Sequence, residues 1–234
     1  LEALRFTSEK YQPDYVEMDV QQTSDGHFIV YHDFSYRPLT GGQGKPEQLP
    51  LSYAESLTVS ENNQTARIPT FDEYLALANQ LDQKLLVEIK TQRKDTAELV
   101  NAFLARYQED LLANGHIMQS LSYTVVEELK AQAPQLISGY IMPFNVVGPP
   151  LTSADFLTME YSTINRNFIA SARTDGKEVF VWTPNDADTI SRMRFYGVDG
   201  IITDQMEILN EELSVTEEDM TYSDKLLNFV IGVG

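Results

Sequence analysis

Apolar segments of strand length alternate along this chain with helical patterns, and this alternation constrains the fold more than any other feature. Apolar or alternating runs stand at residues 15–21, 28–32, 84–90, 116–121, 136–142, 156–161, 178–183 and 200–203. Helical patterns occupy residues 71–81, 95–107, 124–133, 167–174 and 186–196, and residues 1–10 form a short opening pattern of the same kind. Thr70, Thr91 and Ser122 stand where helix N-caps are expected. Strands that alternate with helices predict a mostly parallel sheet.

One connection breaks the alternation. Residues 15–21 and 28–32 are joined by six residues, which is too short for a parallel crossover. Asp25-Gly26 within that link is a turn signal, so this pair is predicted to be an antiparallel hairpin. The remaining seven runs are one fewer than an eight-stranded barrel needs. An open doubly wound sheet is the alternative, but the chain lacks the glycine-rich phosphate turn typical of that fold.

We therefore expect an α/β fold, a TIM (β/α)8-type barrel lacking its first strand, with a small β-hairpin and loop insertion. Residues 40–70 form the longest irregular stretch, and residues 143–154 form a second one. The barrel is expected to span residues 1–206. Residues 207–234 are expected to be an acidic C-terminal extension, and an apolar patch at residues 226–231 is expected to dock on the barrel or on a partner.

The charge balance excludes several kinds of ligand. The chain has 17 Lys and Arg against 35 Asp and Glu, a net charge of −18. Nucleic-acid backbones need clustered basic side chains, so no nucleic-acid partner is expected. Cysteine is absent, which rules out thiolate catalysis and cysteine-based zinc sites. No run reaches the roughly 18 apolar residues of a membrane span, so the chain itself is expected to be soluble.

Two carboxylates, Glu17 and Asp19, lie two residues apart in the first predicted strand. A strand has a period of two, so both side chains point to the same face. Buried side by side they would repel each other, and a divalent cation that binds several carboxylate oxygens would remove that conflict. The alternative is a pair that stands in solvent at the strand end.

Other polar residues stand where strands end. Glu88 and Lys90 close the run at 84–90, so Glu88 is a candidate third carboxylate and Lys90 a candidate phosphate-binding cation; a strand-end salt bridge is the alternative. His32, followed by Asp33, is a candidate general acid or base. Trp182, at the end of the run at 178–183, is a candidate apolar wall for a substrate, or packs under a loop.

Taken together, these segments resemble the glycerophosphodiester phosphodiesterase family. The resemblance is carried by residues 15–26, 29–33, 68–71, 86–90, 181–183 and 197–204, and it extends in order from about residue 1 to residue 204. The most specific part is the block in which Glu17 and Asp19 are followed by Thr23, Asp25-Gly26 and His32-Asp33.

The resemblance implies metal-dependent hydrolysis of a glycerophosphodiester, a small-molecule substrate, to glycerol 3-phosphate and an alcohol. It implies that Glu17, Asp19 and Glu88 hold Ca²⁺ or Mg²⁺. It places His32 at one of two catalytic histidines, and Lys90 at a basic position beside the phosphate.

The chain departs from the family at its N-terminal end. The family's His-Arg-Gly motif and a following Glu-Asn pair precede a helix of the type seen at Leu1-Glu2-Ala3-Leu4, and neither motif is found there. They supply the other histidine and a further metal carboxylate, so this fragment is expected to be impaired. A branch of the family carries the domain behind membrane spans, so an upstream membrane domain and a membrane-associated parent are expected.

Two kinds of alternative function remain open. A phospholipase-D-like or phospholipase-C-like barrel phosphodiesterase would use a similar set of residues. A non-catalytic calcium-binding or regulatory domain would keep the carboxylates without turning over a substrate.

Overall fold

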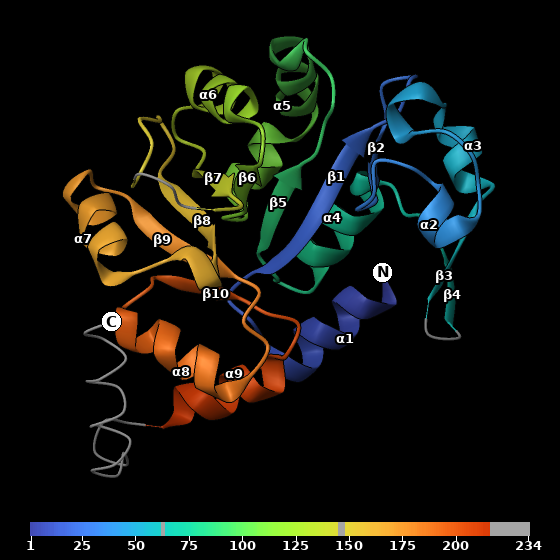
Figure 1. Cartoon of the computed structure of the whole chain (residues 1–234). Coiled ribbons are helices and arrows are strands. Elements are labelled where there is room, and N and C mark those ends of the chain that lie inside the picture. Colours follow the sequence, from blue (N-terminus) through green and yellow to red (C-terminus); the bar gives the residue numbers. More distant parts are fainter. Residues whose placement is uncertain (62–63, 145–147, 216–234) are drawn as a thin grey trace. The chain divides into compact units, whose positions relative to one another are not determined.

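The computed structural model describes residues 1–61, 64–144 and 148–215 (Figure 1). It divides into two compact units, residues 1–138 and residues 139–234, and each is considered by itself. Residues 226–231, expected to form an apolar patch, lie outside the described residues. Among the described helices, none combines the length and the apolar character that a bilayer crossing requires.

The sheet of the first unit is built around strand β1 (Val16–Gln22). Strand β5 (Leu85–Ile89) runs parallel to β1, and β6 (Ile117–Ser120) runs parallel to β5. On its other side β1 pairs with the short strand β2 (Phe28–Val30), and this pair is antiparallel, as predicted. Figure 1 shows β1 as a long arrow between β2 and β5.

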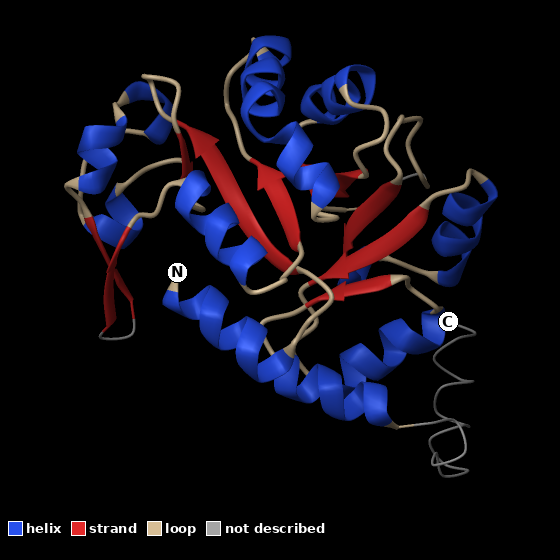
Figure 2. Ribbon diagram, turned by 180° about the vertical axis from the view of Figure 1, so that it is seen from behind, coloured by secondary structure: helices blue, strands red, loops and turns tan. Residues whose placement is uncertain are grey.

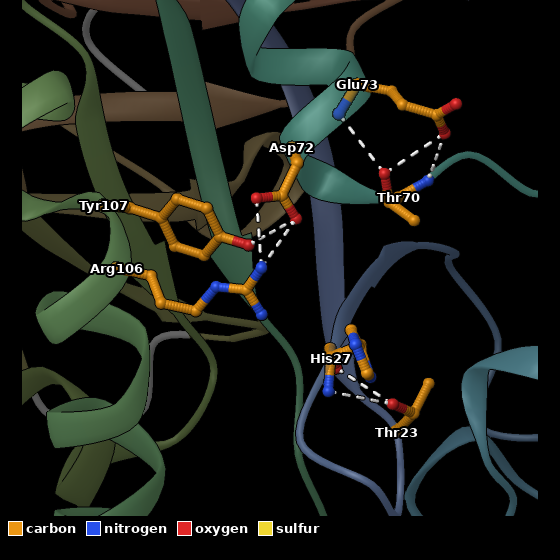
Figure 3. Close-up of polar contacts among 7 residues, drawn as sticks. All are labelled: Thr23, His27, Thr70, Asp72, Glu73, Arg106 and Tyr107. Carbon is orange, nitrogen blue, oxygen red and sulfur yellow. Dashed lines mark hydrogen bonds and ion pairs between the residues drawn. The ribbon is translucent and has the colours of Figure 1, made fainter.

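The turn between β1 and β2 follows from its sequence. Gly26 has a φ of +84°, a conformation that residues with a Cβ adopt at a cost. Thr23 closes the turn: its backbone N–H donates to the carbonyl of His27 at 2.8 Å, and its hydroxyl accepts from the backbone N–H of His27 at 3.1 Å (Figure 3).

Four longer helices belong to this unit: α1 (Glu2–Tyr11), α4 (Phe71–Gln80), α5 (Thr96–Ala113) and α6 (Tyr123–Gln132). Thr70 caps α4 in a capping box with Glu73, and Ser122 caps α6, both as predicted. The prediction for Thr91 was wrong, because the N-cap position of α5 is Asp95, four residues later. The Thr91 hydroxyl instead contacts the carboxylate of Glu47 and accepts from the backbone N–H of Arg93.

Aromatic side chains fill the space between this sheet and its helices. Phe28, Phe71 and Phe103 are at most 1% exposed, and Tyr107 is 3% exposed. Their rings meet with centroids 4.8 to 5.8 Å apart. At the edge of this core the Asp72 carboxylate of α4 accepts hydrogen bonds from Arg106 and from the hydroxyl of Tyr107, which ties α4 to α5 (Figure 3).

Residues 40–70 are more regular than expected. After the short helix α2 (Arg37–Thr40), they form the 3-10 turn η1 (Pro46–Gln48), helix α3 (Leu51–Glu55) and an antiparallel hairpin of β3 (Thr58–Glu61) and β4 (Gln64–Arg67). The hairpin extends away from α2 and α3 (Figure 2). A separate small core that includes Ile29, Tyr36 and Ile68 holds the insertion together. These elements are too short to show a clear period in the sequence.

The second unit repeats the parallel arrangement. Strands β7 (Ser138–Met142), β8 (Phe156–Glu160), β9 (Glu178–Trp182) and β10 (Gly200–Ile202) pair in that order, all parallel. Turn η2 (Tyr161–Thr163) and helix α7 (Arg166–Thr174) connect β8 to β9, and helix α8 (Ala187–Tyr196) connects β9 to β10. The described residues thus contain the seven parallel strands that were predicted, three in the first unit and four in the second.

The described part of the predicted acidic extension is helical. Helix α9 (Met206–Ser214) covers most of the described part and buries Leu209. The guanidinium of Arg194 on α8 donates to the backbone carbonyls of Glu212 and Val215. Residues 216–234 of the extension lie outside the described residues.

Candidate active site

Three carboxylates come together at adjacent positions of β1 and β5. Glu17 and Asp19 share one face of β1 because side chains alternate along a strand. Glu88 stands directly across from Asp19 in the parallel pair. One oxygen from each of the three carboxylates lies within 4.8 Å of the others. The pattern seen in the sequence therefore becomes one compact acidic cluster.

When no cation is bound, the three carboxyls of the cluster have raised pKa values. Burial raises the pKa of Glu17 to about 8, and the neighbouring charges of Asp19 and Glu88 add to this effect. Burial, followed by the charge of Asp19, also raises the pKa of Glu88 to about 8. Burial raises the pKa of Asp19 too, although the positive charges of Lys90 and His32 oppose the shift. Carboxyls in such an environment resist losing their protons.

The residues fit a divalent cation. Oε1 of Glu88 is buried and has no hydrogen-bond partner. A buried polar atom normally has a partner, so this oxygen marks a place where one is needed. Hard divalent cations bind several carboxylate oxygens at once, and a cation shared by the three residues would satisfy Oε1 and remove the repulsion. The solvent-exposed alternative for Glu17 and Asp19 does not describe this buried arrangement.

Lys90 adds a positive charge beside the carboxylates. Its Nζ lies 3.7 Å from Oδ1 of Asp19, and its side chain is only 9% exposed. The same Nζ lies 5.5 Å from the centre of the Phe34 ring. The strand-end salt bridge considered for Lys90 is therefore present, and it links the residue to the cluster. When all three carboxyls are ionised, this one ammonium group leaves the site with an excess of negative charge.

His32 follows β2 and comes directly after Tyr31, whose backbone N–H donates to the carbonyl of Asp19 at 3.2 Å. Its Nδ1 lies 2.8 Å from Oδ1 of Asp33, and its side chain is 67% exposed. A carboxylate accepts from an imidazole N–H, so Asp33 favours the tautomer that carries the proton on Nδ1. Nε2 is then the nitrogen left to exchange a proton with a reacting group.

Trp182 is not part of this group in the first unit. It is the last residue of β9 in the second unit, and its indole Nε1 is buried without a hydrogen-bond partner. The structure brings the residues of the polar cluster together within the first unit, and the role of Trp182 in the second unit stays a prediction.

Two glutamines contribute to the site without having been predicted. Gln119 on β6 stands opposite Glu88 and donates from Nε2 to Oε1 of Glu17 at 3.4 Å. Gln21 continues the face of β1 that carries Glu17 and Asp19, and its amide holds the segment around His32. The period of two along β1 could have indicated Gln21. Nothing in the sequence relates Gln119 to Glu17, because that contact depends on the register of three strands.

Comparisons with known proteins identify the family of this chain. Residues 9–208 match the model of the glycerophosphoryl diester phosphodiesterase family. A glycerophosphodiester phosphodiesterase of Caldanaerobacter subterraneus is 28% identical over 204 residues, which cover 84% of each chain.

Solved structures share the fold. An Oleispira antarctica phosphodiesterase, solved in complex with the product sn-glycerol-3-phosphate, superposes with a TM-score of 0.78 at 20% identity, covering 92% of this chain and 90% of its own. A glycerophosphodiester phosphodiesterase from Thermotoga maritima gives a TM-score of 0.69 at 22% identity, covering 89% and 90%. With seven parallel strands among its described residues, and a family match over 200 of its 234 residues, the chain belongs to the glycerophosphoryl diester phosphodiesterase family, a family of hydrolases of the TIM-barrel type.

Proposed function

We propose that this chain carries the site for metal-dependent hydrolysis of glycerophosphodiesters to glycerol 3-phosphate and an alcohol. The observation that supports this most directly is the convergence of Glu17, Asp19 and Glu88 within 4.8 Å, in a chain of this family. Under this proposal the three carboxylates hold a divalent cation, Ca²⁺ or Mg²⁺. A phosphodiester anion would otherwise approach a cluster of carboxylates in a protein of net charge −18.

Each residue has a distinct part in the proposed reaction. When bound, the cation neutralises the phosphate and polarises its non-bridging oxygens. The ammonium group of Lys90 binds a phosphate oxygen and stabilises the charge that develops on it. Nε2 of His32 exchanges a proton with the attacking or the leaving oxygen, while Asp33 orients the ring through Nδ1. Trp182, in the second unit, keeps its predicted role as an apolar substrate-binding face.

The chain is proposed to turn over slowly by itself. It has three histidines, and two of them are engaged elsewhere. His27 belongs to the β1–β2 turn, and His116 is 3% exposed just before β6, where its ring contacts the backbone of Leu85 and the side chain of Asn79. His32 is thus the histidine available for proton transfer, whereas the reaction needs both a proton acceptor and a proton donor.

Cation binding and turnover test this proposal separately. Calorimetry with Ca²⁺ and Mg²⁺ on the metal-free chain should show weak binding that Asp19→Asn abolishes. Glu109→Gln removes one charge from an exposed position on α5 and serves as the matched control. Absence of binding of either cation to the unaltered chain would contradict the metal site.

Turnover is measured as release of glycerol 3-phosphate from glycerophosphocholine, with intact phospholipids as competing substrates. We expect slow release that EDTA and Asp19→Asn remove and that Glu109→Gln leaves unchanged. Release that continues in EDTA would refute the metal dependence. Turnover near the typical enzyme value of about 10 per second would refute the proposal that this chain turns over slowly. Preferred cleavage of intact phospholipids would indicate one of the other barrel phosphodiesterases.

A further inference from the structure

Gln21 is one of the most completely buried polar side chains of the first unit, at 1% exposure. It lies on the face of β1 that carries Glu17 and Asp19, two residues beyond Asp19. The proposed reaction assigns it no direct part. A buried carboxamide next to a candidate active site therefore needs an explanation.

Both donor positions of the Gln21 amide serve the segment that carries His32. Nε2 donates to the backbone carbonyl of Tyr31 at 2.7 Å and to that of Asp33 at 2.8 Å. These are the residues immediately before and after His32. One side chain thus bridges the backbone on both sides of the histidine.

A third hydrogen bond ties the same segment to the carboxylate strand. The backbone N–H of Tyr31 donates to the carbonyl of Asp19 at 3.2 Å. Strand β2 ends at Val30, so Tyr31, His32 and Asp33 lie beyond the regular pairing of the β1–β2 hairpin. Gln21 supplies hydrogen bonds where the strand ladder no longer does.

The side-chain oxygen of Gln21 has no partner, which shows that the N–H groups of the amide set its orientation. Oε1 is buried and has no hydrogen-bond partner. A buried acceptor without a partner costs stability, and the reverse orientation of the amide would direct Oε1 at two carbonyl oxygens. The amide therefore keeps the orientation that uses both of its N–H groups, at the expense of its oxygen.

We propose that Gln21 is a positioning residue that clamps the Tyr31–Asp33 backbone and so fixes the position of His32 relative to the carboxylate strand β1. Proton transfer requires the imidazole within hydrogen-bond reach of the reacting oxygen, and displacements of about 1 Å can lower a rate by about 10²-fold. The inference rests on the proposed function for its effect on turnover, but the clamp itself can be measured without activity.

The test compares Gln21→Met with a matched control, Gln83→Met. Gln83 is 5% exposed, and its Nε2 also donates to two backbone carbonyls, those of Pro13 at 3.1 Å and Lys84 at 2.9 Å. Gln83 precedes β5 and lies at the opposite end of that strand from Lys90. Both variants lose the same kind of double hydrogen bond, so a general loss of stability affects them alike.

Two measurements test whether Gln21 holds the Tyr31–Asp33 backbone in place. In hydrogen–deuterium exchange, peptides covering residues 31–34 should exchange at least tenfold faster in Gln21→Met and at the unaltered rate in Gln83→Met. In the glycerophosphocholine assay, Gln21→Met should lower kcat at least tenfold with KM within threefold of the unaltered chain, while Gln83→Met keeps both within twofold. Gln21→Glu, which cannot donate to both carbonyls when ionised, should behave like Gln21→Met.

The outcomes separate this inference from the proposed function. Unchanged exchange at residues 31–34 in Gln21→Met, or an equal loss of kcat in Gln21→Met and Gln83→Met, overturns the clamp. Accelerated exchange in Gln21→Met, together with no detectable hydrolysis by the unaltered chain, supports the clamp and contradicts the proposed function. A rise in KM without a fall in kcat would assign Gln21 to substrate binding and also overturn the proposal.

Discussion

Replacing Glu17 by Gln should stabilise the metal-free protein at alkaline pH and leave it almost unchanged at acidic pH. Burial raises the pKa of Glu17 from an ordinary 4.5 to about 8. The folded protein therefore binds the Glu17 proton more tightly than the unfolded chain does. Stability from this group is fully present below pH 4.5 and is lost as the pH rises towards 8. Gln resembles the protonated carboxyl in shape and does not ionise, so it keeps that stability.

The size of the effect follows from the difference between the ordinary pKa of 4.5 and the raised pKa of about 8. Each pH unit between 4.5 and about 8 corresponds to about 1.4 kcal/mol, so Glu17 alone accounts for at most roughly 4 kcal/mol at pH 8. Removal of its charge also relieves Glu88. We expect a gain of at least about 2 kcal/mol in the free energy of unfolding, or roughly 4–8 °C in the midpoint for a chain of this size.

Thermal and urea unfolding in EDTA at pH 5 and pH 8 measure this difference. The two proteins should agree within about 1 kcal/mol at pH 5, and the variant should be the more stable one at pH 8. Added Ca²⁺ or Mg²⁺ should narrow the difference at pH 8 by favouring the unaltered chain, because a ligand at 100 times its Kd stabilises the folded state by about 2.7 kcal/mol. A variant that is less stable than the unaltered chain at pH 8 without metal would refute the account of the acidic cluster.

Three further predictions concern the rest of the first unit. Thr70→Ala removes the capping box of α4 and should cost about 1 kcal/mol in chemical unfolding, whereas Thr70→Ser should cost almost nothing. Phe103→Ala empties a fully buried position between Phe28 and Phe71 and should cost about 3–5 kcal/mol; a loss below about 1 kcal/mol would show that this part of the core is not close-packed. Burial lowers the pKa of His116, so its contribution to stability is present above pH 6.5 and is lost as the pH falls below that value. The difference in unfolding free energy between the unaltered chain and His116→Asn should therefore shrink from pH 7 to pH 5, and a constant difference would contradict it.

Much of the fold was predictable because it depends on local patterns. The apolar runs and helical periods located the sheet strands and six of the helices to within a few residues, except that α5 extends to Ala113 rather than Tyr107. The antiparallel hairpin of β1 and β2 followed from a six-residue link with Asp25-Gly26 at its turn. In each case the signal lies within a short window of sequence, where periodicity and turn chemistry act directly.

Elements held by distant contacts were not predictable in the same way. The hairpin of β3 and β4 and helix α3 lie in residues that were expected to be irregular, since each element is only four or five residues long. Thr91 resembled an N-cap, but Asp95 holds the N-cap position of α5 and the Thr91 hydroxyl contacts Glu47, 44 residues away. Side-chain partners at such separations outweigh local preference.

The sequence by itself determined which residue types were available and which shared a strand face. Glu17 and Asp19 are two apart, so any strand through them places both carboxylates together. Only the tertiary structure decided that Glu88 joins them, that Lys90 pairs with Asp19, and that Gln21 and Gln119 support the cluster. Those contacts depend on the register between β1, β5 and β6 and on the path of the chain after β2. Register and path are set by the packing of the whole core, which no single segment encodes.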